Sequence, residues 1–564
     1  MLALLFSLFG ALAAPVPTLE QLDVLLDAED RRVRDALLVG TPDERRAIIA
    51  PLAATTSKVV SLHLKTASTD PRWAALALRT LLRRKGQLVD AEYATREIVR
   101  ETADDEGQQR LDALLLATEQ LDQLLARKNP PRREVKALRG RVAELQKRLA
   151  LKSRPYRAIA SLIEPSDIAS TLDSRMLLVE FVVYRPWDAK SDTYGEERYA
   201  VYTLERGGSI HGVDVGPAKA IDEAVRRFRG AMTALRDVAP LADDLRARIF
   251  GDVPWVTRAP RVIISPDGLL AHVPFQLVIG RASDDVWNLP RIAYLTSGRE
   301  RPFLGAWDAE TTNPLAVFDI DYGTGRPWGR LPGTVAEGES IAAAFPDTQV
   351  LRGAEATEAA VAKVSRPQFL HIASHGFFEA NLEPTLQRSF TSDDRGLGRP
   401  KNGNAPVEPL ATGVTDIADL RSGVVFAGAN LEGNVTTAAE WSNRDLRGTR
   451  LVVLSACETG LGEIRNGDGV HGLRRALVLA GTQTQVLSLW KVDDKATQVL
   501  MTEFYAQLAK GKGASESLFE AQRAVRTTEG FGHPFYWAAF TLSGRPAVTL
   551  VSEEEASEAE GDAE

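Results

Sequence analysis

The spacing of apolar positions divides the chain into two parts. From residue 18 to about 160, apolar side chains recur every three or four residues among many Ala, Leu, Arg and Glu residues, which is typical of amphipathic helices. Two stretches, 111–125 and 135–149, are especially regular, and an Asn-Pro-Pro sequence separates them. They predict a hairpin of two antiparallel helices. No repeat of about 34 residues is found here, so an array of tetratricopeptide repeats is not expected.

After Pro165 the pattern changes to short β-rich runs separated by Gly and Pro, as at 176–184 and 261–265. Apolar strands then alternate with helical stretches, with strands at 369–373, 451–455 and 486–490 and helices near 469–480, 494–509 and 514–526. This order predicts an α/β fold with a largely parallel sheet covered by helices on both faces.

Four segments follow from these patterns. Residues 1–16 form an apolar N-terminus, 17–165 an all-α helical domain, 170–545 an α/β domain, and 546–564 an acidic tail that we expect to be disordered. The first segment ends in Ala11-Leu12-Ala13, which fits a signal-peptidase site and predicts export to the periplasm after cleavage. No Lys or Arg precedes it, so a buried N-terminal helix in a cytoplasmic protein is the alternative. The segment is too short to span a bilayer, and no membrane span is expected in the mature chain.

Charge and cysteine content exclude several classes of function. The formal net charge is −8, but seven acids lie in 552–564, so the rest of the chain is nearly neutral. A nucleic-acid partner is therefore not expected, because such proteins carry a basic surplus. Cys457 is the only cysteine, which excludes intramolecular disulfides and sites that need two thiolates. His371 and His375 are four apart, but on a strand and without the Glu of a His-Glu-x-x-His helix, so neither zinc nor any other cofactor is expected.

Two apolar strands end in side chains that can do chemistry. The run 369–373 leads to His375 and Gly376, and the run 451–455 leads to Cys457. The carboxyl ends of parallel strands meet at one sheet edge. If the two strands are neighbours, the imidazole can generate or guide the thiolate, which is the true nucleophile. The N–H groups of Gly376 and Cys457 would then bind a developing oxyanion. The order His before Cys is that of caspases rather than of papain.

Five motifs together resemble the CHAT-domain family of caspase-like peptidases related to separase. They are Leu-His-Ile-Ala-Ser-His-Gly (370–376), Val-Val-Leu-Ser-Ala-Cys-Glu-Thr-Gly (452–460), Gly-Asp-Gly-Val-His-Gly-Leu (467–473), Leu-Trp-Lys-Val-Asp-Asp (489–494) and His-Pro-Phe-Tyr-Trp-Ala-Ala-Phe (533–540). Weaker matches at 265–268, 274–275 and 331–334 extend the resemblance back to about residue 170. It implies a caspase-like α/β/α sandwich over 170–545 and a cysteine endopeptidase with His375 and Cys457 as its dyad.

The resemblance also implies a residue that selects the substrate. Asp494 matches the separase aspartate that lines the S1 pocket, with Asp493 beside it. A partly desolvated carboxylate pairs with a basic P1 side chain, so we expect cleavage after Arg, with Lys second. The alternative is that Asp493 or Asp494 caps the helix that begins there, and both roles can hold at once.

Other functions stay open at this point. A non-catalytic caspase-like scaffold would use the helical domain as its recognition surface, and a hydrolase or transferase of small amides would share the dyad. For the peptidase we expect a protein substrate and a regulatory protein partner docked on the helical domain. The long segment 381–415 lies between the two catalytic strands and is rich in Asp, Gly, Pro and Asn. It predicts a lid or a self-cleavage site.

Overall fold

The computed structural model describes residues 17–37, 47–66, 70–87 and isolated positions from 89 to 145, and then 162–551 except for 252, 281–287, 304–309, 326, 379–421, 433, 457–458, 462 and 466–468. Several predictions therefore lie outside the described residues: the N-terminal segment 1–16, most of the hairpin 111–149, the segment 381–415, Cys457 and the tail from 552. Of strands β15 (Glu463–Arg465) and β16 (Gly469–His471), only the backbone is described.

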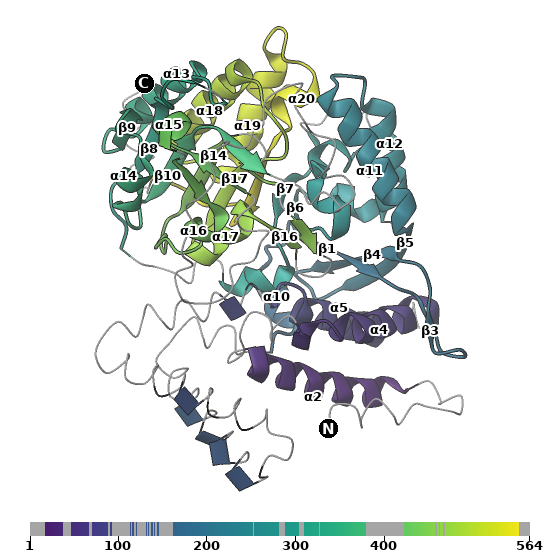
Figure 1. Ribbon diagram of the computed structural model, residues 1–564. Coiled ribbons are helices and arrows are strands. Elements are labelled where there is room, and N and C mark those ends of the chain that lie inside the picture. Colours follow the sequence, from purple (N-terminus) through teal and green to yellow (C-terminus); the bar gives the residue numbers. More distant parts are fainter. Residues whose placement is uncertain are drawn as a thin grey trace, which may run out of the picture.

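An 11-stranded sheet forms the centre of the described part of the chain (Figure 1). Its strands, in spatial order, are β5 (Ile210–Pro217), β4 (Arg198–Glu205), β1 (Met176–Tyr184), β6 (Arg261–Ser265), β7 (Arg291–Tyr294), β18 (Phe540–Gly544), β17 (Thr484–Ser488), β14 (Leu451–Ser455), β10 (Phe369–Ala373), β8 (Leu315–Ile320) and β9 (Gln349–Gly353).

Most neighbouring strands run parallel, as the sequence predicts. The strands from β1 to β18 form one parallel block and those from β17 to β9 form a second. The two blocks meet at the antiparallel pair β17–β18, and the hairpin strands β4 and β5 extend the first block antiparallel. Strands of both blocks are buried on both faces, which explains their continuous apolar runs.

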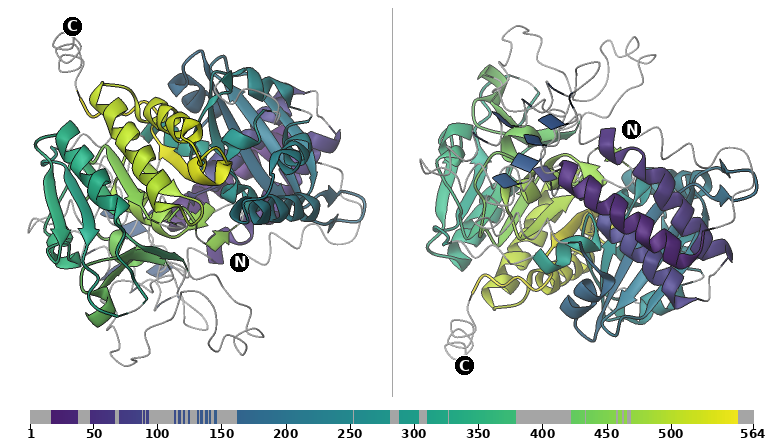
Figure 2. Two further views of the ribbon diagram at one scale, coloured as in Figure 1. Left: turned by 90° about the horizontal axis from the view of Figure 1, so that it is seen from above. Right: turned by 90° about the horizontal axis from the view of Figure 1, so that it is seen from below.

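Helices cover both faces of the sheet, which makes an α/β/α sandwich (Figures 1 and 2). One face packs against α11 (Ala218–Thr233), α12 (Ala239–Phe250), α13 (Gly333–Ala344), α18 (Asp494–Ala509), α19 (Ala514–Thr527) and α20 (Pro534–Trp537). The opposite face of the second block packs against α14 (Glu358–Ala362), α16 (Ala438–Trp441) and α17 (Leu473–Ala480). In β10, Phe369 and Ala373 point to the first face and Leu370 and Ile372 to the second, the alternation that a strand imposes.

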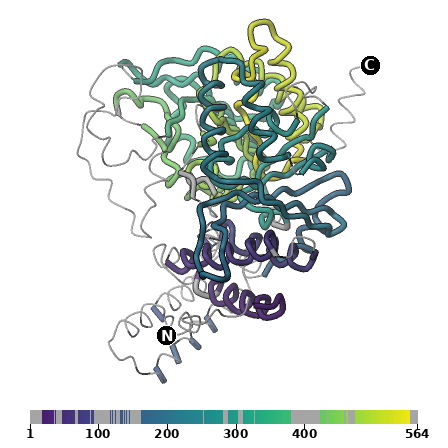
Figure 3. The backbone as a smooth tube through the Cα atoms, turned by 90° about the vertical axis from the view of Figure 1, so that its right-hand side faces the viewer, coloured from purple at the N-terminus to yellow at the C-terminus, as the bar shows by residue number. Residues whose placement is uncertain are grey.

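The N-terminal helices pack on the remaining face of the first block. They are α2 (Leu19–Leu37), α4 (Leu52–Thr66), α5 (Pro71–Arg84) and the short α10 (Pro165–Thr171), and Figures 1 and 3 show α2, α4 and α5 as the purple layer beneath the sheet. Val60 of α4 and Leu82 of α5 belong to the same buried cluster as Leu178 of β1 and Tyr202 of β4. The helices and the sheet therefore share one hydrophobic core.

Local sequence signals explain where α5 begins. Asp70 caps it by accepting a hydrogen bond from Arg72 N, and Pro71 occupies the first turn, where its missing N–H costs nothing.

The helical stretch Ala47–Lys65, which includes most of α4, is long and apolar enough to cross a membrane by length and composition. Three apolar residues of this stretch, Val59, Val60 and Leu62, pack into the shared core.

A buried ion pair joins the end of α5 to the sheet. Lys85 and Glu180 are 3% and 0% exposed, and Lys85 Nζ lies 2.8 Å from Glu180 Oε1. Lys85 also donates to Phe181 O and to Ser265 Oγ, while the Glu180 carboxylate accepts from Ser265 Oγ and Gly298 N. Every charge in this cluster has a partner, which a buried ion pair requires if it is not to destabilise the fold.

Candidate active site

The two strands that carry the predicted dyad are neighbours. β10 and β14 pair in parallel, and their register places Ala373 opposite Ser455. His375 follows Ala373 by two residues, and in the sequence Cys457 follows Ser455 by two. The expected adjacency of the strands is thus confirmed. Cys457 itself lies outside the described residues, so its contact with His375 stays a prediction.

The His375 imidazole is half-buried between two aromatic rings. Its centroid lies 5.0 Å from that of Tyr322 and 5.3 Å from that of Trp328. Its Nε2 lies 2.7 Å from the carbonyl oxygen of Gly329. A carbonyl oxygen can only accept, so Nε2 carries the hydrogen and donates. In the neutral ring Nδ1 is then the unprotonated nitrogen, the one that can accept a proton.

The surroundings of His375 favour its neutral form. Burial lowers the pKa of His375, and the positive charge of Lys491 lowers it further. The hydrogen bond to Gly329 and the negative charge of Asp494 act in the opposite direction without cancelling the effect of burial. The neutral imidazole, which is the form that acts as a base, therefore persists below the pH at which a free histidine is half protonated.

Hydrogen bonds fix the backbone on both sides of His375. Ser374 N donates to Ser455 O of β14 at 3.2 Å, and the Ser374 hydroxyl donates to Val425 O and lies 3.1 Å from Tyr322 Oη. In turn, Val425 N donates to His375 O at 3.0 Å. His375 is thereby tied both to the central sheet and to a second, three-stranded sheet.

This second sheet places the predicted oxyanion donor. It consists of β11 (Gly376–Phe378), β12 (Ser422–Val425) and β13 (Val435–Thr437), with β11 at its edge. Gly376 is the first residue of β11 and lies opposite Val424 of β12. The candidate oxyanion donor next to the imidazole therefore belongs to a paired strand rather than to an unsupported loop.

The two candidate S1 aspartates have different partners. Asp493 is the N-cap of α18, and its Oδ1 accepts a hydrogen bond from Ala496 N at 3.0 Å. Asp494 is the first residue of α18, and its Oδ2 accepts from Gly333 N at 2.7 Å. Capping of α18, the alternative interpretation of this pair, thus applies to Asp493. The Asp494 carboxylate is partly exposed and close enough to His375 for its charge to act on the imidazole.

His371 belongs to the core and not to the site. It is fully buried on β10, and its Nδ1 lies 3.0 Å from Tyr505 Oη of α18. Its Nε2 lies 2.9 Å from Glu337 Oε1 of α13. Within the described ranges, no group of three His, Cys, Asp or Glu side chains has the geometry of a metal site.

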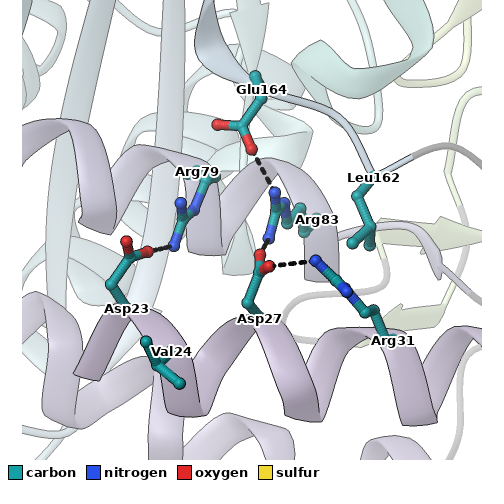
Figure 4. A pocket seen from close by; sticks show the side chains of 8 residues that line it. All are labelled: Asp23, Val24, Asp27, Arg31, Arg79, Arg83, Leu162 and Glu164. Atoms are coloured by element: carbon teal, nitrogen blue, oxygen red, sulfur yellow. Dashed lines mark hydrogen bonds and ion pairs between the residues drawn. The ribbon is translucent and has the colours of Figure 1, made fainter. Parts of the chain in front are cut away.

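A pocket of about 330 Å³ lies elsewhere, between α2, α5 and the residues before α10. Figure 4 shows that charged side chains line it and pair with one another across it. Arg83 lies between Asp27 and Glu164, and Arg79 pairs with Asp23. Because these charges already neutralise one another, the pocket presents no unmatched charge to a ligand, and we do not assign it to the chemistry at His375.

Three neighbours of His375 were missed by the sequence interpretation: Tyr322, Trp328 and Gly329. Tyr322 follows the end of β8 by two residues, and β8 is the strand next to β10. The rule that drew attention to His375, that side chains just beyond parallel strands converge, would have found Tyr322 if it had been applied to β8. Trp328 and Gly329 follow no strand end directly, and no local pattern indicates their contacts.

With this geometry in place, comparison with known proteins assigns the chain to a family. The CHAT domain family matches residues 238–545, so the chain belongs to the CHAT domain family. The α/β/α sandwich that the sequence predicts, with a helical N-terminal part, is confirmed.

Among curated proteins, the chain is similar to tetratricopeptide repeat protein 28. The protein from Mus musculus is 30% identical over 315 residues, which cover 51% of this chain and 12% of that protein. The protein from Homo sapiens is 28% identical over 314 residues, with the same shares covered. The matched part of this chain thus spans about one eighth of the length of these relatives.

Among solved structures, similar chains include a cysteine proteinase and a separase. The Arg specific cysteine proteinase gingipain R is 10% identical, with 55% of this chain and 68% of that chain covered and a TM-score of 0.33. Separase in the Saccharomyces cerevisiae separase–securin complex is also 10% identical, with 93% and 40% covered and a TM-score of 0.44.

Proposed function

We propose that this chain is a cysteine endopeptidase in which His375 and Cys457 form the catalytic dyad. The observation that carries the proposal is the parallel pairing of β10 and β14, in which Ala373 lies opposite Ser455. His375 and Cys457 each follow one of these paired residues by two positions. The neutral imidazole, with Nε2 hydrogen-bonded to a carbonyl oxygen, supports it as well, because such a ring is already in the tautomer of a base.

In the proposed mechanism, His375 Nδ1 accepts the thiol proton while Cys457 Sγ attacks the carbonyl carbon of the scissile peptide bond. The electron pair of the C=O bond moves to oxygen, and the Gly376 and Cys457 N–H groups stabilise the resulting oxyanion. Collapse of this intermediate expels the amine, which takes the proton from His375. Water then attacks the thioester with His375 again as the base, which releases the acid and restores the thiol.

Asp494 is the proposed determinant of cleavage after Arg, with Lys second. Asp493 is occupied as the cap of α18, whereas the Asp494 carboxylate is partly exposed and near His375. A guanidinium can form two parallel hydrogen bonds with a carboxylate, which favours Arg over the single ammonium of Lys. A neutral P1 side chain would leave the carboxylate desolvated without a partner.

An activity-based probe tests this proposal. We expect a P1-Arg acyloxymethyl ketone to label the wild-type protein at Cys457, as located by peptide mass spectrometry. Cys457→Ala should not be labelled, and His375→Ala should be labelled at about 10²- to 10⁴-fold lower rate. A scrambled probe without the P1 Arg is the control. Wild-type rates of labelling in His375→Ala would refute the dyad.

A non-catalytic scaffold is the second candidate, and one observation favours it. The curated relatives are named for tetratricopeptide repeats, which build surfaces for binding proteins. In this interpretation a regulatory partner docks on the N-terminal helices, where Val24 and Leu25 of α2 are exposed. Absence of Cys457 labelling with and without candidate partners would favour the scaffold.

Self-cleavage within 381–415 remains part of the peptidase proposal, and identical intact masses of wild type and Cys457→Ala over time would exclude it.

A further inference from the structure

The segment 328–334 contacts both ends of the proposed site. At its start, the Trp328 ring contacts the His375 ring at a tilt, and Gly329 O accepts from His375 Nε2. Five residues after Trp328, Gly333 N donates to Asp494 Oδ2. One short stretch of chain thus holds the proposed base and the proposed P1-selecting carboxylate.

Gly333 leaves room that any other residue would fill. A Cβ at this position would lie 2.7 Å from the Asp494 carboxyl carbon and 2.8 Å from each of its oxygens. The backbone of Gly333 is not in the left-handed region, so an L residue could adopt its conformation. Any side chain at this position would therefore displace the Asp494 carboxylate, so the constraint on Gly333 is one of space and not of backbone freedom.

Gly333 is also the first residue of α13, and its N–H has no partner within its own helix. The Asp494 carboxylate, on α18, accepts the hydrogen bond from this N–H. The partial positive charge at the N-terminus of α13 also favours an anion at this place. The contact orients one oxygen of the carboxylate, Oδ2, toward α13. In the described part of the chain, no second donor to this carboxylate is seen.

Packing deeper in the fold fixes α13 and α18 relative to β10. Gly338 of α13 lies so close to Phe318 of β8 that a Cβ there would be 2.0 Å from the ring. From β10, His371 reaches Glu337 of α13 on one side and Tyr505 of α18 on the other. The two helices that make the Gly333–Asp494 contact are therefore both anchored to β10, the strand that leads to His375.

We propose that Gly333 is a positioning residue for P1 selection, whose N–H and missing side chain hold the Asp494 carboxylate in reach of a basic P1 side chain. The inference rests on the proposed peptidase function and adds to it a residue that acts through Asp494. Gly333 touches neither the substrate nor the dyad in this scheme. Its substitution should change which P1 side chain is preferred and, at a pH where His375 is neutral, leave the reactivity of the thiol unchanged.

The test compares peptide substrates with P1 Arg and P1 citrulline, which have the same shape but differ in charge. We expect Gly333→Ala to lower the Arg-to-citrulline ratio of kcat/KM about tenfold, because the added methyl displaces the carboxylate and weakens a charged hydrogen bond. Asp494→Asn should bring the ratio close to one. Gly230→Ala is the matched control, because a Cβ there on α11 meets nothing within 4 Å, and its ratio should equal that of wild type.

Further measurements separate this inference from the proposed function. Alkylation of Cys457 by iodoacetamide needs no S1 pocket, so its rate should be the same in wild type and Gly333→Ala at a pH well above 6.5, where His375 is neutral wherever the Asp494 charge lies. In an Asp494→Ala background, Gly333→Ala should have no further effect on the ratio, because the carboxylate through which it acts is gone. If Gly333→Ala does not fold, Asp494→Glu replaces it: moving the carboxylate by one methylene should lower the ratio as well.

The outcomes are distinct. An Arg-to-citrulline ratio that stays at the wild-type value in Gly333→Ala, or in Asp494→Glu where the first variant does not fold, overturns the role of Gly333 and leaves the peptidase intact. A wild-type protein without Cys457-dependent cleavage of either substrate overturns the peptidase and this inference with it. A ratio that falls while the alkylation rate holds supports the positioning role.

Discussion

At the scale of single residues, the character of His375 comes from its neighbours and not from its own position in the sequence. Two aromatic rings remove water from the imidazole, and one carbonyl oxygen chooses its tautomer. Both effects keep Nδ1 unprotonated and available. A histidine that follows a parallel strand is held in this neutral form only when residues from another segment, here Tyr322, Trp328 and Gly329, contact it.

The pH dependence of turnover should reveal this environment. Burial lowers the pKa of His375, and the neutral ring is the proposed base, so kcat/KM should fall with decreasing pH only below about 6.5, the ordinary value for histidine. Lys491→Met removes a charge that lowers this pKa, so the acidic limb should move to higher pH. Lys510→Met, exposed at the far end of α18, should leave the profile unchanged. A limb that does not move in Lys491→Met would contradict this electrostatic account.

A second histidine predicts a pH dependence of stability. His63 of α4 is fully buried against Tyr202, and burial lowers its pKa to about 4. Between pH 6.5 and 4, His63 binds a proton in the unfolded chain but stays neutral in the folded chain. The free energy of unfolding should therefore be highest above pH 6.5 and decrease as the pH falls toward 4. The unfolding equilibrium constant should rise by at most about tenfold per pH unit from this group.

Urea unfolding between pH 7 and 4 measures this effect. His63→Gln cannot titrate and should flatten the dependence, whereas His211→Gln, at an exposed position of β5, should not. Equal slopes in wild type and His63→Gln would show that other groups carry the acid sensitivity.

At the scale of elements, the sequence predicts those whose signals are local. The helix expected at 494–509 is α18, residue for residue, because Asp493 is a cap and the apolar positions follow it. The strands expected at 369–373 and 451–455 are β10 and β14 with the same bounds. The helix expected near 469–480 begins only at Leu473, after the short strand β16, whose partner is the equally short β15.

Local sequence signals do not predict the order in which the strands lie in the sheet. Nothing near β18 predicts that this last strand lies between β17 and β7 and joins two oppositely running blocks. The Gly333–Asp494 contact, across 161 residues, is of the same kind. Such contacts depend on how helices stack on a completed sheet, which is a property of the whole fold.

The buried pair Lys85–Glu180 gives a prediction at the element scale. Lys85→Met leaves Glu180 charged, buried and without its cation, which should cost about 3 to 5 kcal/mol of the free energy of unfolding. Adding Glu180→Gln should recover much of this loss, because the uncompensated charge is gone. Lys512→Met, which breaks an exposed pair with Glu516, should cost less than about 1 kcal/mol. Chemical denaturation of the four proteins measures each value, and equal losses for the two lysine variants would contradict the role of burial.

At the scale of the whole molecule, the N-terminal helices complete the fold of the sheet. Their apolar side chains and one face of β1, β4 and β6 form a single buried cluster, with Lys85–Glu180 beside it. A second link joins the helical part to α17, where Arg475 Nη2 lies 2.8 Å from Glu92 Oε1 and Leu479 packs against Val89. A partner bound to these helices would therefore touch elements that are continuous with the strands of the site.

This shared core predicts that the α/β part cannot stand alone. A fragment of residues 170–551 would expose one face of β1, β4 and β6, including Leu178 and Tyr202, and would leave Glu180 without Lys85. An apolar surface of this kind favours aggregation. We expect the fragment to be insoluble or to melt well below the matched fragment 17–551, which keeps the helices and lacks only the two terminal segments. Size-exclusion chromatography and thermal melts of both fragments measure the difference, and a monomeric 170–551 fragment that melts with 17–551 would show that the helices are dispensable for the fold.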